Sequence, residues 1–261
     1  MTRVRPKKYL GQHFLNDLDI ARRITESLPT PPSHVIEVGP GMGVLTQFLI
    51  QRPEINLRLV EIDDESVTFL YNHYPQLKDQ IIEGDFLKLD LKALFPKQFS
   101  VIGNFPYNIS SQIFFKAYHN RHQIHSVVGM VQREVGRRIA SGPGSKEYGI
   151  LSVLLQSFFD IEYLFTVDEG VFTPPPKVKS AVVRLVRNEV DQLPCDEDLF
   201  LRVVKTAFNQ RRKMLRNSLS KLAFDLPALT HLPVFNRRPE QMSVTEFQEL
   251  TKMIQMHPLC E

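Results

Sequence analysis

The tetrapeptide Asn104-Phe105-Pro106-Tyr107 contains side chains suited to holding a planar amine for methyl transfer. The lone pair of an aromatic amine is delocalised into its ring, and hydrogen-bond acceptors aimed at the N–H groups favour localising it toward a methyl donor. The Asn104 side-chain oxygen and the Pro106 carbonyl can supply two acceptors, and Tyr107 can stack on a base. Elsewhere in the chain this would be a plain Asn-x-Pro turn. After the fourth strand of a cofactor-binding sheet, it predicts a methyl-transfer site that works by positioning and electrostatics.

A glycine-rich turn, Glu37-Val38-Gly39-Pro40-Gly41-Met42-Gly43, lies between a predicted strand and a predicted helix. Glycines allow a tight turn and let a ligand approach the backbone closely. The G-x-G-x-G spacing differs from the G-x-G-x-x-G of most dinucleotide-binding proteins, so an ordinary strand-to-helix turn is the alternative for this motif alone. We include Gly39, Gly41 and Gly43 in a predicted cofactor site because of the residues that follow.

Two carboxylates come at the ends of the next two predicted strands. Glu61 lies 22 residues after Gly39, where an acidic side chain can accept hydrogen bonds from both ribose hydroxyls. Asp85 ends the third strand, where a carboxylate can meet an adenine amino group. Either acid alone could be solvated, but the three strand ends together indicate an adenosine-bearing cofactor without pyrophosphate. We therefore predict S-adenosylmethionine, with Ile62 and Phe86 beside the two carboxylates in the same site.

The hydrophobic pattern places these motifs on alternating strands and helices. Short apolar runs predict strands at 34–39, 56–62, 80–83, 99–103, 125–131, 161–167 and 180–186. Helical spacing predicts intervening helices, including 43–51 and one that Ser110 caps. This alternation is typical of an α/β fold, a mostly parallel sheet with helices on both faces.

A polar, proline-terminated segment from Asn188 to Pro194 is a candidate linker. Beyond it the pattern is helical, and Ser243 with Glu246 forms a capping-box pattern before an apolar helix face. We predict a methyltransferase domain over 1–188 and a small helical domain that binds RNA or the ribosome over 189–261.

The composition of the 261-residue chain limits its class. Only two cysteines exclude a disulfide scaffold and fit a cytoplasmic protein, and no apolar stretch is long enough for a membrane span. The basic N-terminus lacks a following apolar segment, so we expect no signal peptide. Residues 202–238 hold nine basic side chains and one acidic one, which favours a polyanionic partner.

Four separated motifs in the same order resemble the family of small-subunit (16S) ribosomal RNA adenine N6,N6-dimethyltransferases, KsgA or RsmA. The resemblance runs from Lys8 to about Arg238. The four motifs are Glu37 to Gly43, Gly103 to Ser110, Phe172 to Val183 and Ala207 to Lys213, and the resemblance begins with the run Lys8 to Leu15.

The resemblance implies a class I methyltransferase fold, Rossmann-like, with a seven-stranded sheet and a small C-terminal helical domain. It implies that S-adenosylmethionine donates methyl groups to N6 of two adjacent adenosines near the 3′ end of 16S rRNA, late in assembly of the small subunit. Asn104, Phe105, Pro106 and Tyr107 match the target-base motif, and Phe172 matches a ring that flanks the flipped adenine opposite Tyr107. By motif position, the cofactor contacts are His13, Leu15, Gly39, Glu61, Asp85 and Asn104.

Two residues depart from the family pattern. His13 stands where the family usually has Asn, and a cationic imidazole near a sulfonium would weaken cofactor binding below about pH 6. Phe105 stands where Leu is commoner, and we expect this apolar change to be tolerated.

Basic clusters are the predicted RNA contacts, although a single cluster is equally typical of a solvated face. We expect the N-terminal arm to stay mobile until RNA or cofactor binds. The trio His119, His122 and His125 does not predict a metal site, because no cysteine or acidic ligand set accompanies it. The predicted RNA-binding residues are Arg133, Arg137, Lys177, Lys179, Arg211, Arg212, Lys213 and Arg216.

Two other functions fit parts of the pattern. One is a 23S rRNA adenine N6-methyltransferase of the macrolide-resistance type, which shares the cofactor turn and the Asn-x-Pro-aromatic motif. The other is a non-catalytic RNA-binding assembly factor, which would not need Glu61, Asp85 or the Asn104 motif. The Phe172 segment and the stretch Phe208 to Lys213 favour the small-subunit enzyme, and the lack of a dimer stripe favours a monomer.

Overall fold

The computed structural model describes residues 4–29, 34–95, 97–222 and 224–258. The chain divides into two compact units, Met1–Arg137 with Asp160–Arg187, and Arg138–Phe159 with Asn188–Glu261. None of the helices in the described ranges is long and apolar enough to cross a membrane.

The first unit is built on a sheet that, within the described ranges, has seven strands in the order β4-β3-β2-β5-β6-β9-β7. Strands β2 to β6 are parallel and β9 is antiparallel to β6. The predicted α/β class and the implied seven-stranded sheet are therefore confirmed. The strands are β2 (His34–Val38), β3 (Asn56–Glu61), β4 (Ile81–Glu83), β5 (Phe99–Asn104), β6 (Ile124–Gln132), β7 (Phe159–Val167) and β9 (Ser180–Arg187).

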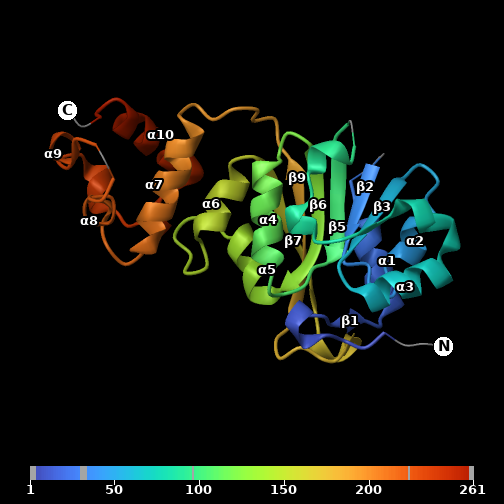
Figure 1. The fold of residues 1–261 in the computed structure, drawn as a ribbon. Coiled ribbons are helices and arrows are strands. Elements are labelled where there is room, and N and C mark those ends of the chain that lie inside the picture. The colour runs from blue at the N-terminus through green and yellow to red at the C-terminus, as the bar shows by residue number, and fades with distance from the viewer. Residues whose placement is uncertain (1–3, 30–33, 96, 223, 259–261) are drawn as a thin grey trace. The chain divides into compact units, whose positions relative to one another are not determined.

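Helices α1 (Leu18–Glu26), α2 (Thr46–Leu49) and α3 (Asp64–His73) group on one side of these strands, and α4 (Ser110–His119) lies on the other (Figure 1). On the first side, residues such as Ile24, Leu49 and Leu70 join alternate strand residues in one hydrophobic core. On the α4 side, Phe114 packs edge-on against Phe105. Because successive strand side chains point to opposite faces, apolar strands buried on both faces are what a covered parallel sheet requires.

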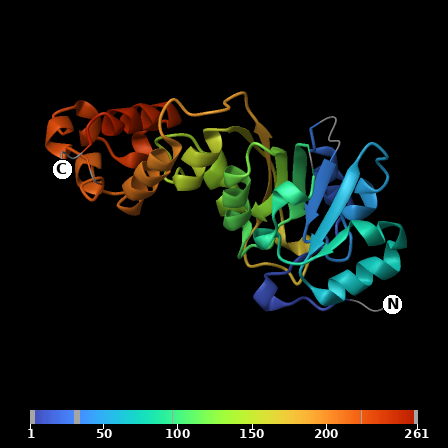
Figure 2. The same ribbon diagram turned by 45° about the horizontal axis from the view of Figure 1, so that its top comes forward.

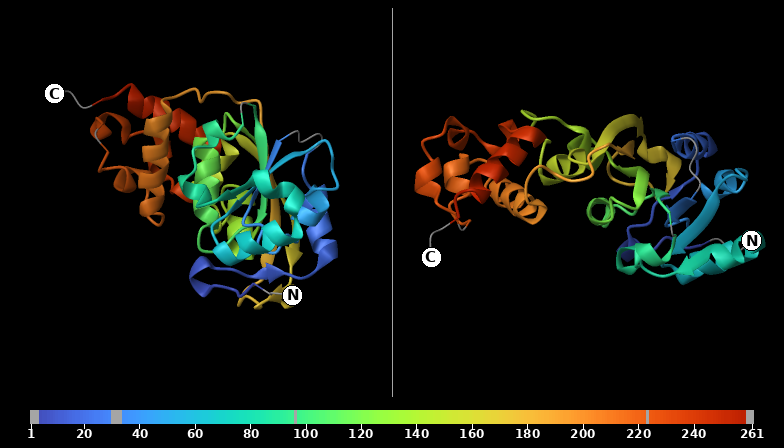
Figure 3. Two further views of the ribbon diagram at one scale, coloured as in Figure 1. Left: turned by 45° about the vertical axis from the view of Figure 1, so that its right-hand side comes forward. Right: turned by 90° about the horizontal axis from the view of Figure 1, so that it is seen from above.

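The N-terminal segment forms part of this unit. Strand β1 (Phe14–Leu15) pairs antiparallel with β8 (Phe172–Thr173), so segments far apart in the sequence lie side by side, blue against yellow in the left view of Figure 3. Asn16 adds a backbone bond to the carbonyl of Val171 and a side-chain bond to Thr173. These contacts join residues 14–16 to the rest of this unit, and the expected mobility of the N-terminal arm before RNA or cofactor binds stays a prediction.

The second unit contains α6 (Ile150–Gln156), α7 (Glu197–Asn209), α8 (Leu215–Ser218), α9 (Leu226–Leu229) and α10 (Val244–Gln255), the last four drawn orange to red in Figure 2. Helix α5 (Arg133–Ala140) begins in the first unit and ends in this one. In the core of the second unit, the Phe208 ring packs against the rings of both Tyr148 and Phe247. The predicted capping box is present, since the Glu246 N–H donates to Ser243 Oγ and the Ser243 N–H to Glu246 Oε2.

The second compact unit includes residues 138–159, because α6 is apolar and packs on α7 and α10. Two details of the helices differ from the predictions. Helix α2 is shorter than 43–51, since turns occupy the residues before Thr46. Ser110 is the first helical residue rather than the cap, and its hydroxyl donates to the Tyr107 carbonyl.

Candidate active site

A pocket opens at the carboxyl ends of β2 to β5, the edge at which open α/β sheets bind ligands. The strand order brings Gly39, Glu61, Asp85 and Asn104 to this edge, although they are far apart in the sequence. The N-terminal segment from Leu10 to Phe14 forms another wall. The remaining lining residues are Val38, Gly41, Val60, Ile62, Gly84, Phe86, Leu87, Phe105, Pro106, Tyr107, Asn108 and Ile109.

The glycine turn adopts the left-handed backbone conformation that favours glycine, with φ of 67° at Gly39 and 56° at Gly41. A methyl group on Gly39 would meet only Pro106 at 3.9 Å, so the space beside it is open to a ligand. Gly43 shares the conformation but faces the ring of Tyr74, and it does not line the pocket. Its role is to form the turn.

Glu61 is almost fully buried at the end of β3. Its Oε2 accepts the N–H of Gly41 at 2.9 Å, which ties the carboxylate to the glycine turn. Its Oε1 accepts the N–H groups of Ile62 and Asp63, both at 2.9 Å. Burial raises the pKa of Glu61, while these three bonds favour the charged form and oppose that rise.

A second carboxyl group, Glu37, is buried at the end of β2 and accepts the Thr46 hydroxyl at 2.7 Å. Burial raises the pKa of Glu37 to about 8, and the charge of nearby Glu61 adds to the rise. Glu37 is the first residue of the glycine motif, and its residue type and position predict no role for it. Its burial below the turn could not be read from residue type.

Asp85 and Phe86 form the third side of the pocket. Asp85 is half-buried, and its Oδ1 accepts the Leu87 N–H at 2.9 Å, which caps a short 3-10 helix from Phe86 to Lys88. The Lys116 amine lies 5.6 Å from the centre of the buried Phe86 ring and donates to the Leu87 carbonyl. Lys116 of α4 thus fixes the loop that carries the Asp85 carboxylate.

The orientation of Asn104 is set by the N-terminal segment. Its Nδ2 donates to the backbone carbonyl of His13 at 2.8 Å. Because the amide's donor end is engaged there, its Oδ1 is the end that remains to accept a hydrogen bond from a ligand. The pocket therefore contains the acceptor that the sequence predicts, and the neighbouring chain holds it in place.

Tyr107 is held by two contacts. Its hydroxyl shares a 2.5 Å hydrogen bond with buried Ser180, and burial raises the pKa of the phenol, so it stays neutral. The His13 ring stacks on it, with ring centroids 5.2 Å apart and 28° between the planes. His13 Nδ1 also lies 2.8 Å from the Pro174 carbonyl.

Phe105, the second departure from the family pattern, is buried with 1% of its surface exposed. Glycines on β5 and β6 leave room for its ring, since a methyl group on Gly129 would come within 2.3 Å of it and one on Gly103 within 2.9 Å. The expected tolerance of the larger side chain at this position therefore has a structural basis.

Besides Gly43, two predicted site residues lie outside the pocket. Phe172 is buried in the hydrophobic core because its strand β8 pairs with β1, which turns the ring inward beside Leu15. The ring stacked on Tyr107 in this structure is that of His13, and the placement of Phe172 opposite Tyr107 beside a flipped adenine stays a prediction. Leu15 is also buried in the core, although it borders a small cavity behind the glycine turn.

The pocket fits an adenosine-bearing cofactor, and Gly39 and Glu61 are the residues that bear on this fit. The open side of Gly39 is a cradle that a side chain would fill, as expected for a backbone that contacts a ligand. Three backbone N–H groups use most of the roughly four acceptor sites of Glu61. A ribose diol would therefore share the free site or replace the Gly41 contact.

The predicted RNA-binding residues occur in both units. In the first, Arg137 and Lys177 are exposed, Arg133 is half-buried, and Lys179 pairs with Asp168 at 2.5 Å.

In the second unit, Arg212 and Lys213 are exposed on the turn after α7. Arg211 donates to the Ser145 carbonyl at 3.0 Å and Arg216 to Asn236 Oδ1 at 2.9 Å. Arg211 therefore has a structural bond besides any phosphate contact.

Comparison with known proteins identifies the family. A family model described as "Ribosomal RNA adenine dimethylase" matches residues 3–231. The chain belongs to this family. Among curated relatives, the "Ribosomal RNA small subunit methyltransferase A" of Parabacteroides distasonis is 60% identical over 259 residues, 98% of this chain and 97% of the relative. The protein of the same name from Bacteroides thetaiotaomicron is 57% identical over 258 residues, 98% of this chain and 96% of the relative.

Solved structures show the same fold. A dimethyladenosine transferase from Plasmodium falciparum has a TM-score of 0.78 at 23% identity, covering 95% of this chain and 100% of that chain. The 23S rRNA methyltransferase ErmE has a TM-score of 0.67 at 25% identity, covering 92% and 99%. A dimethyladenosine transferase and a 23S rRNA methyltransferase thus share one architecture, and the fold alone does not separate them.

Proposed function

We propose that this dimethylase uses S-adenosylmethionine to dimethylate N6 of two adjacent adenosines near the 3′ end of 16S rRNA, within the immature small ribosomal subunit. The observation that supports this most directly is the arrangement of one pocket. Glu61 and the glycine turn lie at its cofactor end, and Asn104 presents a free acceptor at the other.

The chain's own residues orient the reacting amine. S-adenosylmethionine, when bound, supplies a methyl group on a good leaving group, so no acid catalyst is needed. Asn104 Oδ1 and the Pro106 carbonyl accept the two N–H groups of the target base and direct its lone pair. Tyr107 stacks on the base, which repays part of the few kcal/mol that flipping a base costs.

Proton loss needs no dedicated base in the pocket. The aminium formed on transfer is strongly acidic, and its proton can pass to water at the pocket mouth. Glu61 holds its carboxylate toward the backbone of the glycine turn, which suits ribose binding rather than proton transfer. Positioning and the exclusion of bulk water carry most of the rate.

The basic residues hold the RNA backbone rather than read its sequence. The exposed members are Arg137 and Lys177 in the first unit and Arg212, Lys213 and Arg216 in the second. Their contacts with phosphates make binding depend steeply on salt. We further propose that the enzyme is cytoplasmic and that it is a monomer. Sedimentation at micromolar concentration tests the monomeric state.

The competing function is methylation of 23S rRNA. The names of the 60% and 57% identical relatives favour the small subunit, and the ErmE likeness is much more distant. A discriminating experiment offers labelled S-adenosylmethionine with unmethylated small subunits and, separately, with large-subunit RNA, followed by nucleoside mass analysis.

Dimethyladenosine from small subunits alone is the expected result. Label in large-subunit RNA contradicts the proposal and assigns the resistance-type activity. Absence of label in either, with cofactor still bound, assigns a non-catalytic role in assembly. An Asn104→Ala variant in the same assay controls for contaminating methyltransferases.

A further inference from the structure

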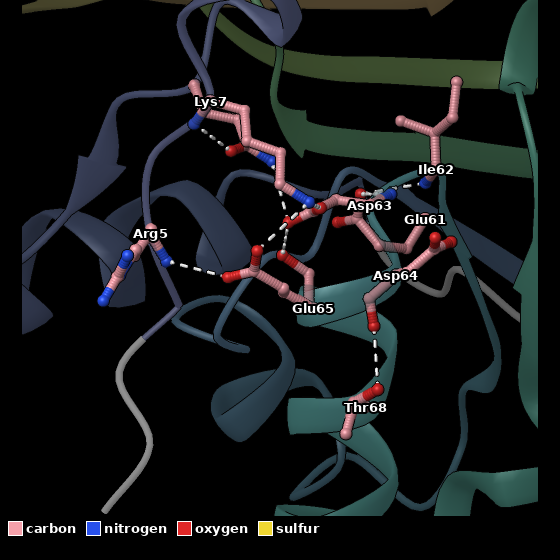
Figure 4. Close-up of polar contacts among 10 residues, drawn as sticks. Arg5, Lys7, Glu61, Ile62, Asp63, Asp64, Glu65 and Thr68 are labelled. Carbon is pink, nitrogen blue, oxygen red and sulfur yellow. Dashed lines mark hydrogen bonds and ion pairs between the residues drawn. The ribbon is translucent and has the colours of Figure 1, made fainter.

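The N-terminal wall of the pocket is fastened to the end of β3 by a buried carboxylate. The Lys7 amine contacts Asp63 in an ion pair and lies 3.5 Å from Glu65 (Figure 4). The Asp63 side chain is 0% exposed and also accepts the Ser66 hydroxyl at 2.8 Å. The Arg5 backbone N–H adds a longer bond to Glu65 at 3.3 Å.

Gln12 carries this fastening into the pocket. Its Nε2 donates to Asp63 Oδ2 at 3.3 Å, and its Oε1 accepts the Lys7 backbone N–H at 2.8 Å. Both ends of the amide are therefore engaged, which closes residues 7–12 into a loop. Gln12 and the adjacent Gly11 and His13 line the pocket, so the loop's position fixes that wall.

The same residue also contacts the cofactor end of the pocket. The Asp63 backbone N–H donates to Glu61 Oε1 at 2.9 Å, while its side chain holds Lys7 and Gln12. One residue thus connects the N-terminal wall with the carboxylate proposed to bind ribose.

The positive charge of Lys7 stabilises the ionised form of the buried Asp63 carboxylate. Burial opposes its ionisation, but the hydrogen bonds from Lys7 and its two other donors prevail and lower the pKa of Asp63. The hydrogen bond to Asp63 raises the pKa of Lys7. Removing Lys7 would leave a buried charge without its counter-ion, which is costly. Glu65 is 49% exposed, and exposed ion pairs contribute little.

We propose that Asp63 and Lys7 are positioning residues that keep the segment 7–13 closed over bound S-adenosylmethionine and so slow its release. This rests on the proposed cofactor. A wall that is already in place before binding loses less entropy on binding, so the ion pair acts on cofactor affinity. Methyl transfer should change little, because the pairing of β1 with β8 and the Asn16 bonds hold the chain next to His13, whose carbonyl orients Asn104, without Lys7.

The test compares Lys7→Met and Asp63→Asn with Glu65→Gln as the matched control on the same amine. We expect the first two to raise the Kd for S-adenosylmethionine about tenfold, mainly through faster dissociation, with kcat at saturating cofactor within threefold of wild type. Glu65→Gln should change Kd less than twofold. Lys7→Arg, which keeps the charge, should restore most of the affinity.

Two results overturn the proposal. One is an unchanged Kd in Lys7→Met. The other is a fall in kcat without a change in Kd or KM for the cofactor. Lys7 is only partly buried, so its variant tests the idea even if Asp63→Asn fails to fold. Kd is measured by calorimetry without RNA, so failure of the proposed rRNA activity is distinguishable from failure of this inference.

Discussion

The imidazole of His13 stacks on the phenol ring of Tyr107, with 5.2 Å between their centroids. A base stacked between the two rings would need roughly twice that separation, so His13 must swing away if adenine uses this face of Tyr107. The His13 backbone can stay in place as the ring moves, which preserves its carbonyl contact with Asn104.

His13→Asn removes the ring that covers Tyr107. We expect a lower KM for small subunits, by up to about fivefold, because less stacking must be broken before the base enters. Steady-state kinetics at saturating cofactor measure it. A raised KM for RNA would show instead that His13 is part of the base-binding surface.

Asn104→Ala removes the acceptor aimed at the target amine. We expect turnover at saturating cofactor to fall by about 100-fold or more, the usual cost of losing one preorganised polar contact in a transition state. Single-turnover methylation of small subunits provides the rate. Asn72→Ala, an exposed change on α3, is the control and should leave it unaltered. Loss of less than fivefold would remove Asn104 from the catalytic role.

Tyr107→Ala and Tyr107→Phe separate the ring from its hydroxyl. The alanine variant should keep cofactor binding and lose methylation, because the stacking surface is gone. The phenylalanine variant loses only the bond to Ser180 and should retain turnover within about threefold. Parallel binding and methylation assays decide the matter, and equal losses in both variants would assign the function to the hydroxyl.

Gly129→Ala should destabilise the protein by about 1–3 kcal/mol, because its methyl group would overlap the buried Phe105 ring. Phe105→Leu in the same chain should recover part of that loss by making room. Urea unfolding of the two single variants and the double variant yields the coupling free energy. Simple additivity would mean that the two sites do not contact.

Glu37→Gln should change how stability depends on pH. The pKa of Glu37 is raised from 4.5 to about 8 in the folded protein, so its contribution is fully present below pH 4.5 and is lost as pH rises to about 8. The variant has no carboxyl group to ionise at this position. As pH rises across that window, its free energy of unfolding should therefore increase relative to that of the wild type, by at most about 1.4 kcal/mol per pH unit. Urea unfolding at pH 5, 6.5 and 8 measures the difference, and a constant difference contradicts the buried, protonated carboxyl.

Much of the site follows from local patterns in the sequence. Alternating strands and helices place the residues that end each strand at one edge of a parallel sheet, so Glu61, Asp85 and Asn104 could be assigned to a common pocket from their positions alone. The glycine turn is equally local, because its left-handed backbone depends on residue type.

Contacts between distant segments were decided only by the tertiary structure. The Asn104 amide is oriented by a carbonyl 91 residues away, and Lys7 meets Asp63 across 56 residues. Phe172 was expected in the pocket, but the pairing of β8 with β1 turns it into the core. Residue type states what a side chain can bind. Which partner it binds depends on how the whole chain buries its apolar surface, and no short motif records that.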